Sequence, residues 1–127
     1  IDSVRRLFPT RRLLVVFQPH LYSRTQDFAQ DFAEVLSAAD ALMLLPIYPA
    51  RELPIPGVTS HWLLSLMPAS HTSAQVVEKT QLVASLSTQV QQWVAAGQPC
   101  VVMTLGAGDI DRLVSDIKQN LTIYEQD

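Results

Sequence analysis

Short runs of hydrophobic residues alternate along the chain with stretches in which hydrophobic residues recur every three or four positions. Residues 13–17, 41–45 and 100–105 form brief and almost wholly apolar runs, and residues 74–77 form a weaker one. Runs of this length and composition are typical of buried strands in a parallel sheet. The stretch from Pro46 to Gly57 is rich in proline, which cannot donate a backbone hydrogen bond, so it is predicted to be a loop.

The intervening segments have helical spacing. A helix is predicted after the first run, a short one beginning at Thr59 or Ser60, a long one from about Thr80 until Gly97, and a last one capped by Asp109. The hydrophobic positions expected to face the core are Phe28, Phe32, Val35 and Leu36 in the first helix, Trp62, Leu63, Leu66 and Met67 in the short one, Leu82, Val83, Leu86, Val90, Trp93 and Val94 in the long one, and Ile110, Leu113, Val114, Ile117 and Leu121 in the last.

This alternation predicts an α/β domain with a parallel sheet and helices on both of its faces, because right-handed crossovers place successive helices over the sheet. A chain of 127 residues is expected to form one domain. Val4, Leu7 and Phe8 are spaced like the last turns of a helix that stops before Pro9. The chain is therefore expected to be a fragment cut inside its first helix.

Composition narrows the possible functions. The net charge is −3 and no basic stripe occurs, so nucleic acid is not expected as a partner. No apolar run approaches the ~20 residues of a membrane helix, and a soluble cytoplasmic protein is expected. The single cysteine, Cys100, rules out an internal disulfide and is expected in the core. The sequence contains no P-loop, no nucleophile elbow and no metal-binding motif.

The first strand is followed by a turn dense in polar side chains. His20 and Arg24 are close enough in sequence to converge on one small anion, for which the planar guanidinium suits a carboxylate. The alternative is structural: Pro19 shapes the turn, Thr25 caps the helix and Arg24 is merely solvated. Spacing alone does not choose between the two interpretations.

Two further turns follow strands. The loop after the second strand carries Tyr48, Arg51 and Glu52 between stiffening prolines, with a surface salt bridge as the alternative to a ligand contact. In the third turn, Gly106 and Gly108 allow close backbone approach to a ligand, but taken alone they are better explained by a tight turn with Asp109 as the helix cap. Because parallel strands end at the same edge of a sheet, all three turns are expected there.

Three motifs, FQPHLYSRT, YPARELPIPGVTS and LGAGDIDRL, in this order, resemble the C-terminal domain of the Mur ligases, the ATP-dependent ligases of peptidoglycan synthesis. The resemblance implies that residues 1–127 are a Rossmann-like C-terminal domain, separated from an N-terminal UDP-binding domain and a central ATPase domain. It implies ATP and Mg²⁺ as cofactors, held mainly by the central domain. In the members resembled most, an acyl phosphate on UDP-N-acetylmuramate is attacked by L-alanine. The fragment alone is expected to be inactive.

The resemblance also implies roles for residues. Arg24 would bind the alanine carboxylate with help from His20, and the third turn would line the same pocket. A second group of residues would face the cleft in which the nucleotide binds. No catalytic residue and no metal ligand is assigned in this chain. Many relatives have arginine where this chain has Leu21; if that arginine helps to hold the carboxylate in them, the site here has one positive charge fewer. The pocket turn comprises Gly106, Ala107, Gly108 and Asp109, and the cleft group comprises Tyr22, Tyr48, Arg51 and Glu52.

Three other functions stay open. The related ligase that recycles murein peptides has a similar architecture but a different sequence in place of FQPH. A free-standing nucleotide-binding module is suggested by the Gly106–Gly108 turn, although a dinucleotide fingerprint normally occurs in the first βα unit. A purely structural or partner-docking domain is the third.

Overall fold

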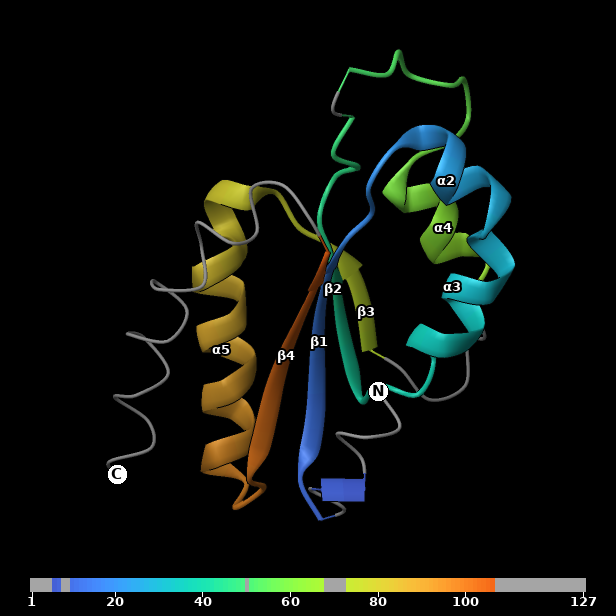
Figure 1. Cartoon of the computed structure of the whole chain (residues 1–127). Coiled ribbons are helices and arrows are strands. Elements are labelled where there is room, and N and C mark those ends of the chain that lie inside the picture. Colours follow the sequence, from blue (N-terminus) through green and yellow to red (C-terminus); the bar gives the residue numbers. More distant parts are fainter. Residues whose placement is uncertain (1–5, 8–9, 50, 68–72, 107–127) are drawn as a thin grey trace.

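A computed structural model of the chain describes residues 6–7, 10–49, 51–67 and 73–106 (Figure 1). The predicted final helix after Asp109 lies outside the described residues, as does most of the helix expected before Pro9.

The described strands form one parallel sheet. They are β1 (Arg12–Gln18), β2 (Ala41–Leu44), β3 (Ser73–Val76) and β4 (Cys100–Gly106), in the spatial order β3-β2-β1-β4. Strand β1 pairs with β2 from Leu14 opposite Ala41, and with β4 along its whole length. All four predicted strands are confirmed to within a residue or two. The wholly apolar runs become β1 and β2, the two central strands.

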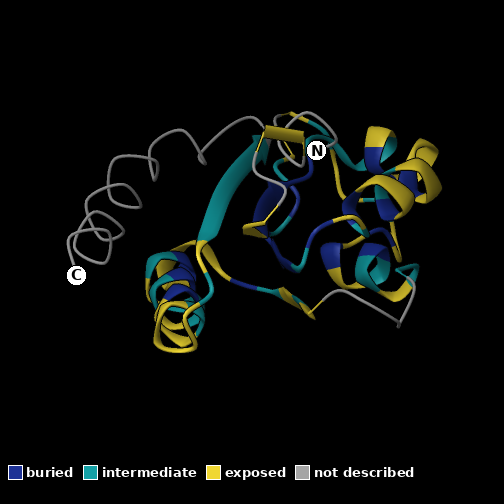
Figure 2. Ribbon diagram, turned by 90° about the horizontal axis from the view of Figure 1, so that it is seen from below, coloured by how far each residue is buried: buried dark blue, intermediate teal, exposed yellow. Residues whose placement is uncertain are grey.

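Helices cover both faces of this sheet. Helices α2 (Tyr22–Asp27), α3 (Ala29–Leu36) and α4 (Ser60–Ser65) lie on one face, and α5 (Leu82–Ala95), entered through the 3-10 turn η1 (Lys79–Gln81), lies on the other (Figures 1 and 2). The expected fold class, a Rossmann-like three-layer α/β arrangement, is therefore confirmed.

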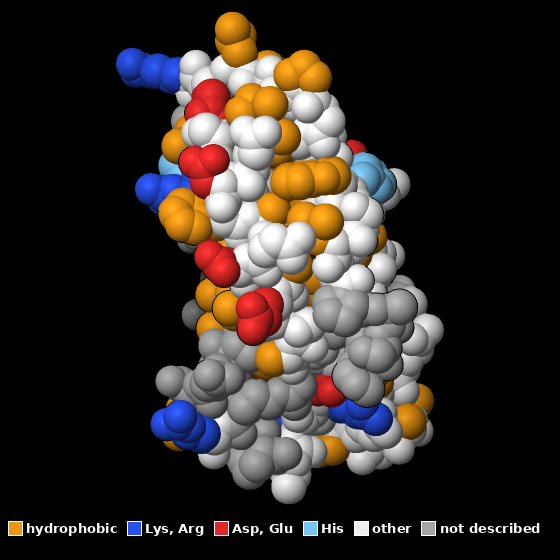
Figure 3. Space-filling view, turned by 90° about the vertical axis from the view of Figure 1, so that its right-hand side faces the viewer, with side chains coloured by type: hydrophobic (Ala, Val, Ile, Leu, Met, Phe, Trp, Pro, Cys, Tyr) orange, Lys and Arg blue, Asp and Glu red, His pale blue; other side chains and the backbone are white. Residues whose placement is uncertain are grey.

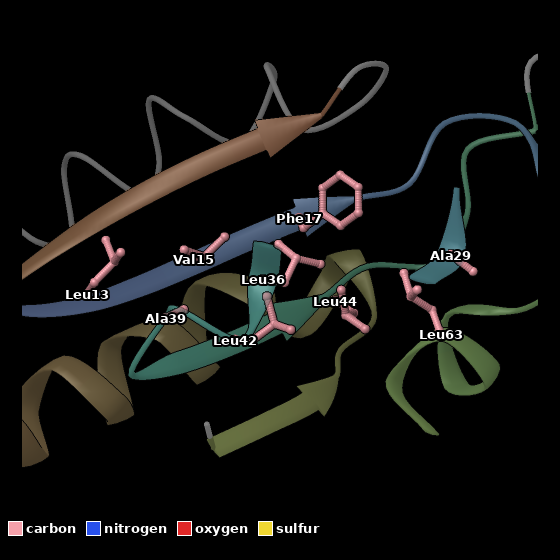
Figure 4. Packing of buried hydrophobic residues seen from close by; sticks show 9 residues of the cluster. All are labelled: Leu13, Val15, Phe17, Ala29, Leu36, Ala39, Leu42, Leu44 and Leu63. Atoms are coloured by element: carbon pink, nitrogen blue, oxygen red, sulfur yellow. The ribbon is translucent and has the colours of Figure 1, made fainter. Parts of the chain in front are cut away.

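The two faces bury separate hydrophobic clusters. Alternate residues of β1 point to opposite faces, so Leu14 and Val16 pack with Leu82 and Leu86 on the α5 side. Leu13, Val15 and Phe17 pack on the other side with residues of β2, α3 and α4, as Figure 4 shows. A strand that is buried on both faces reads as a continuous hydrophobic run, which explains the pattern in the sequence.

The first predicted helix is wrong in two respects. It is interrupted at Phe28, where φ is −112° and ψ is 16°, so that α2 and α3 are separate helices. In α3 the buried residues are Ala29, Ala33 and Leu36, whereas Phe28 and Val35 are 49% and 55% exposed. The small alanines turn toward the sheet, and Phe32 reaches the core by packing its ring 5.2 Å from that of Phe17.

Two other details of the prediction change. Cys100 is only half-buried, because β4 lies at the edge of the described sheet and only β1 pairs with it there. Val94 is 42% exposed, although Leu82, Leu86 and Val90 of the same predicted stripe are buried as expected.

The predicted helix signals are otherwise found. The Thr59 hydroxyl accepts a hydrogen bond from the Trp62 amide at 3.0 Å, which makes Thr59 the cap of α4, while the Ser60 hydroxyl donates to the Leu45 carbonyl. Gly97 has φ 73°, the left-handed conformation that ends a helix, and the Gln98 amide then closes back on the Trp93 carbonyl at 2.8 Å.

Candidate functional site

The turn after β1 and the loop after β2 meet at the carboxyl edge of the sheet (Figure 1). His20 forms an isolated parallel bridge with Tyr48, beyond the last regular pair of β1 and β2. Gly106 lies opposite Gln18 at the same edge, where β4 ends. Ala107, Gly108 and Asp109, the rest of the predicted pocket turn, lie outside the described residues.

Backbone hydrogen bonds hold the first turn against the second loop. The Tyr48 amide donates to the Pro19 carbonyl at 2.8 Å, and the Leu21 amide donates to the Tyr48 carbonyl at 2.9 Å. The His20 imidazole stacks on the Tyr48 ring, with centroids 5.8 Å apart and an interplanar angle of 21°. The resemblance to Mur ligases implies that His20 supports the amino-acid pocket and that Tyr48 faces the nucleotide cleft, and in the structure these two side chains are stacked.

Leu21 begins α2 in an unusual conformation. Its φ is 68° and its ψ is 138°, and its hydrophobic side chain makes no capping hydrogen bond. Positive φ is costly for a side chain with a Cβ atom, and such residues persist only where the surroundings enforce them. Here the enforcement comes from the pairing of the Leu21 amide with Tyr48 and from the buried Thr25 hydroxyl, which donates to the Leu21 carbonyl at 2.7 Å.

Thr25 is therefore not the helix cap considered from the sequence. It lies inside α2 and is fully buried, and its backbone amide as well as its hydroxyl is directed to the Leu21 carbonyl. The start of α2 receives its side-chain acceptor from a different part of the chain.

That acceptor is Glu52 of the second loop. Its carboxylate accepts hydrogen bonds from the Ser23 amide at 2.8 Å and from the Ser23 hydroxyl at 2.6 Å. A tight turn supports the glutamate, because its own amide donates to the Pro49 carbonyl at 2.8 Å. The surface salt bridge considered for this loop is not found in the described part of the chain, where the partner of Glu52 is a serine.

These contacts favour the charged form of the glutamate. The Ser23 hydroxyl, and next the Ser23 amide, lower the pKa of Glu52 below its usual value of 4.5. Partial desolvation opposes that shift, while the Tyr22 amide and the charge of His20 add to it. The carboxylate is consequently ionised at neutral pH, next to the first turn of α2.

Two arginines remain open to solvent at this edge. Arg24 follows Ser23 in α2 and Arg51 precedes Glu52, and both are exposed. Among the residues that the structure describes, neither guanidinium has a hydrogen-bond or ion-pair partner. Figure 3 shows the face over α2, α3 and α4, where acidic side chains gather along one edge and cationic side chains project beyond them.

Sequence reasoning missed Gln18, the last residue of β1. It is only 3% exposed, and its side-chain Oε1 has no hydrogen-bond partner in the described part of the chain. Buried polar atoms are nearly always paired, so an orphaned oxygen at the ligand edge of a sheet is notable. The available signal was an amide side chain directly after the apolar run of residues 13–17.

Other candidate features are weaker. Within the described ranges there is no group of three or more His, Cys, Asp or Glu side chains that could hold a metal ion, and no helix there has the length and hydrophobicity needed to cross a membrane. A hollow lies between the edge strand β3 and helix α5, and the side chains that line it carry amides and hydroxyls but no charge. It is lined by Gln75, Ser85, Thr88, Gln89 and Gln92.

Curated proteins with closely similar sequences share one description. The chain is 46% identical over 120 residues to the UDP-N-acetylmuramate–L-alanine ligase of Flavobacterium johnsoniae. This alignment covers 94% of this chain and 24% of that protein. It is 48% identical over 118 residues to the ligase of the same name from Cytophaga hutchinsonii, and 49% identical over 121 residues to the one from Porphyromonas gingivalis. These alignments cover 93% and 95% of this chain, but 23% and 25% of the two relatives.

The resemblance to Mur ligases of the alanine-adding type, inferred from the three motifs, is thus confirmed over nearly the whole chain. The chain spans about a quarter of the length of the curated relatives it matches. No protein-family model matches it.

Proposed function

Starting from that similarity, we propose that this chain is the C-terminal domain of an ATP-dependent ligase that joins L-alanine to UDP-N-acetylmuramate in peptidoglycan synthesis. The observation that carries the proposal is the identity of 46–49% with three proteins of that name over at least 93% of this chain. The reaction belongs to the complete, cytoplasmic parent enzyme, of which this chain supplies one domain without turnover of its own.

In the proposed reaction, ATP phosphorylates the lactyl carboxylate of the UDP-sugar, and the amino group of L-alanine displaces phosphate from the acyl phosphate. This domain holds the amino acid. Arg24 is an exposed guanidinium at the carboxyl edge of the sheet, where open α/β sheets bind ligands, and its planar fork suits the alanine carboxylate. His20, four positions earlier, is proposed to supply a second hydrogen-bond donor to the same carboxylate. The turn from Gly106 to Asp109 completes the pocket.

Orientation is the chemical contribution of such a site. A carboxylate held by Arg24 and His20 leaves the amino group of alanine free to point toward the acyl phosphate. Holding two reactants in line can lower a barrier by roughly 7–11 kcal/mol in well-oriented cases. The proposal needs no proton acceptor in the described residues, and none is assigned.

The nucleotide is assigned to a cleft between this domain and the central domain of the parent enzyme, which this domain closes. Tyr22, Tyr48 and Arg51 are proposed to face that cleft. Glu52 is proposed to lie at the same cleft, but its carboxylate accepts hydrogen bonds from Ser23 and is assigned a structural role rather than a nucleotide contact. Magnesium would offset the charge of the phosphates when bound. No group of three or more His, Cys, Asp or Glu side chains that could hold a metal ion occurs among the described residues, and the ion is proposed to be held mainly by the central domain.

The test is phosphate release by the full-length parent enzyme with ATP, magnesium, UDP-N-acetylmuramate and a panel of amino acids. We expect release that depends on both the UDP-sugar and L-alanine. Release that depends on a murein peptide instead would favour the recycling ligase. Without any release, a free-standing nucleotide-binding module or a docking domain becomes the better interpretation, and tight nucleotide binding by the 127-residue chain would select the former.

A further inference from the structure

We propose that Glu52 is a positioning residue for the amino-acid site. By accepting both hydrogen bonds that Ser23 can donate, it caps helix α2 from the neighbouring loop and fixes the backbone that carries Arg24. The inference rests on the proposed function, in which Arg24 binds the alanine carboxylate. Neither the sequence pattern nor the similarity to known ligases assigns this contact.

The start of α2 needs such an acceptor. The first amides of a helix have no partner within the helix, and they are usually satisfied by a side chain at the residue before it. That residue is Leu21, whose hydrophobic side chain cannot accept a hydrogen bond. Glu52 takes over this function from 29 positions away in the sequence, and its negative charge also suits the positive end of the helix dipole.

The contact reaches the ligand site because α2 is short. The helix contains six residues, and the bonded Ser23 directly precedes Arg24. A single turn and a half of helix is unstable alone, so its conformation depends on contacts at its ends. At its start, those contacts are the Glu52 carboxylate and the pairing of Leu21 with Tyr48.

The second loop is fixed by the same interaction. Tyr48 pairs with the first turn through its backbone, and Glu52 attaches to α2 through its side chain, so the loop is fastened at both points. Glu52 therefore links the backbone of Arg24 to that of Arg51, its own neighbour. Both arginines stay exposed, because Glu52 is engaged by Ser23 and neutralises neither of them in the described structure.

The experiment compares variants of the full-length parent enzyme. Glu52→Ala removes the acceptor, Glu52→Gln keeps an acceptor oxygen without the charge, and Ser23→Ala removes only the hydroxyl donor. Glu34→Ala is the matched control, since Glu34 is an exposed glutamate of α3 whose side chain makes no hydrogen bond or ion pair with the described residues. For each variant, the Michaelis constants for alanine and ATP are measured, together with hydrogen exchange of the α2 and α5 amides.

Glu52→Ala is expected to raise the alanine constant about tenfold and the ATP constant less, and to speed exchange in α2 while α5 is unchanged. Glu52→Gln should have a smaller effect on the alanine constant, because its amide oxygen still accepts from the Ser23 amide. In the double variant, Ser23→Ala should add little to the effect of Glu52→Ala on the alanine constant, since the two residues share one interaction. Glu34→Ala should match the unmodified enzyme.

Two results would overturn the inference, and they differ from failure of the proposed function. If Arg24→Ala raises the alanine constant but Glu52→Ala and Ser23→Ala do not, the amino-acid site stands and the positioning role is wrong. If Glu52→Ala leaves exchange in α2 unchanged, the cap is not needed and the role is again wrong. If Arg24→Ala leaves the alanine constant unchanged, the assignment of the amino-acid site fails first, and the positioning role fails with it.

Discussion

The imidazole of His20 lies on the phenol ring of Tyr48, with 5.8 Å between the ring centroids. The two residues are 28 positions apart in the sequence, and a β-bridge past the end of the regular sheet brings them together. This contact joins the turn proposed to bind the amino acid to the loop proposed to face the nucleotide.

Replacing Tyr48 tests that contact. Tyr48→Ala in the parent enzyme is expected to raise the Michaelis constant for alanine several-fold, because a stacked pair contributes about 0.5–1.5 kcal/mol and holds His20 in place. Tyr48→Phe keeps the stacked ring and should leave the constant close to that of the unmodified enzyme. Equal Michaelis constants for Tyr48→Ala and the unmodified enzyme would show that the position of His20 does not depend on its stacking with Tyr48.

Arg24 and Arg51 are expected to affect different substrates. Arg24→Ala removes a charged contact with the carboxylate and should raise the alanine constant about tenfold or more, with a smaller change for ATP. Arg24→Lys should give an intermediate value, since an ammonium keeps the charge but not the planar fork. Arg51→Ala should instead raise the Michaelis constant for ATP more than that for alanine. Steady-state kinetics with each substrate varied in turn measures this, and an unchanged alanine constant in Arg24→Ala contradicts the assignment.

The lowered pKa of Glu52 predicts how stability depends on pH. A carboxyl group with a lowered pKa in the folded state stabilises the fold above its unfolded pKa, and this contribution is lost as the pH falls through the folded value. The denaturation midpoint of Glu52→Gln should thus lie below that of the unmodified chain at neutral pH. As the pH falls below 4.5, the difference between the two midpoints should narrow, because the carboxylate becomes protonated. A gap that stays constant across this range would mean that the ionised carboxylate is not the stabilising form.

The orphaned oxygen of Gln18 predicts a gain in stability. Methionine has a similar shape and no strong acceptor, so Gln18→Met removes an unpaired buried oxygen and should raise the free energy of unfolding by about 1 kcal/mol. Chemical denaturation of the two chains measures the difference. A clear loss of stability would mean that the Gln18 amide is hydrogen-bonded in solution.

Two hydrophobic residues of α5, Leu86 and Val94, are predicted to differ in how much they contribute to stability. Leu86→Ala opens a cavity in the cluster on the α5 face of the sheet and should cost about 2–5 kcal/mol of unfolding free energy. Val94→Ala, at a position that is 42% exposed, should change it by no more than about 0.5 kcal/mol. Similar losses for both variants would show that α5 is not seated as described.

The sequence alone determined the strands, the long helix and the layers of this domain. A strand buried on both faces must be apolar throughout, and a helix that covers a sheet must repeat its hydrophobic residues every three or four positions, so both elements can be recognised from neighbouring residues. The stop at Gly97 and the cap of α4 were predictable for the same reason. The similarity of the three motifs to Mur ligases also required only the order of residues along the chain.

Only the tertiary structure decided how the site is assembled. Glu52 and Ser23 are 29 positions apart, and no local pattern indicates that a loop glutamate caps a helix whose own first position is a leucine. The break at Phe28 likewise interrupts a continuous helical pattern, and after it Ala29 and Ala33 are buried whereas Val35 is exposed. Hydrogen bonds and packing between distant segments are set by the folded geometry, whereas the hydrophobic spacing that marks a strand or a helix can be read from neighbouring residues.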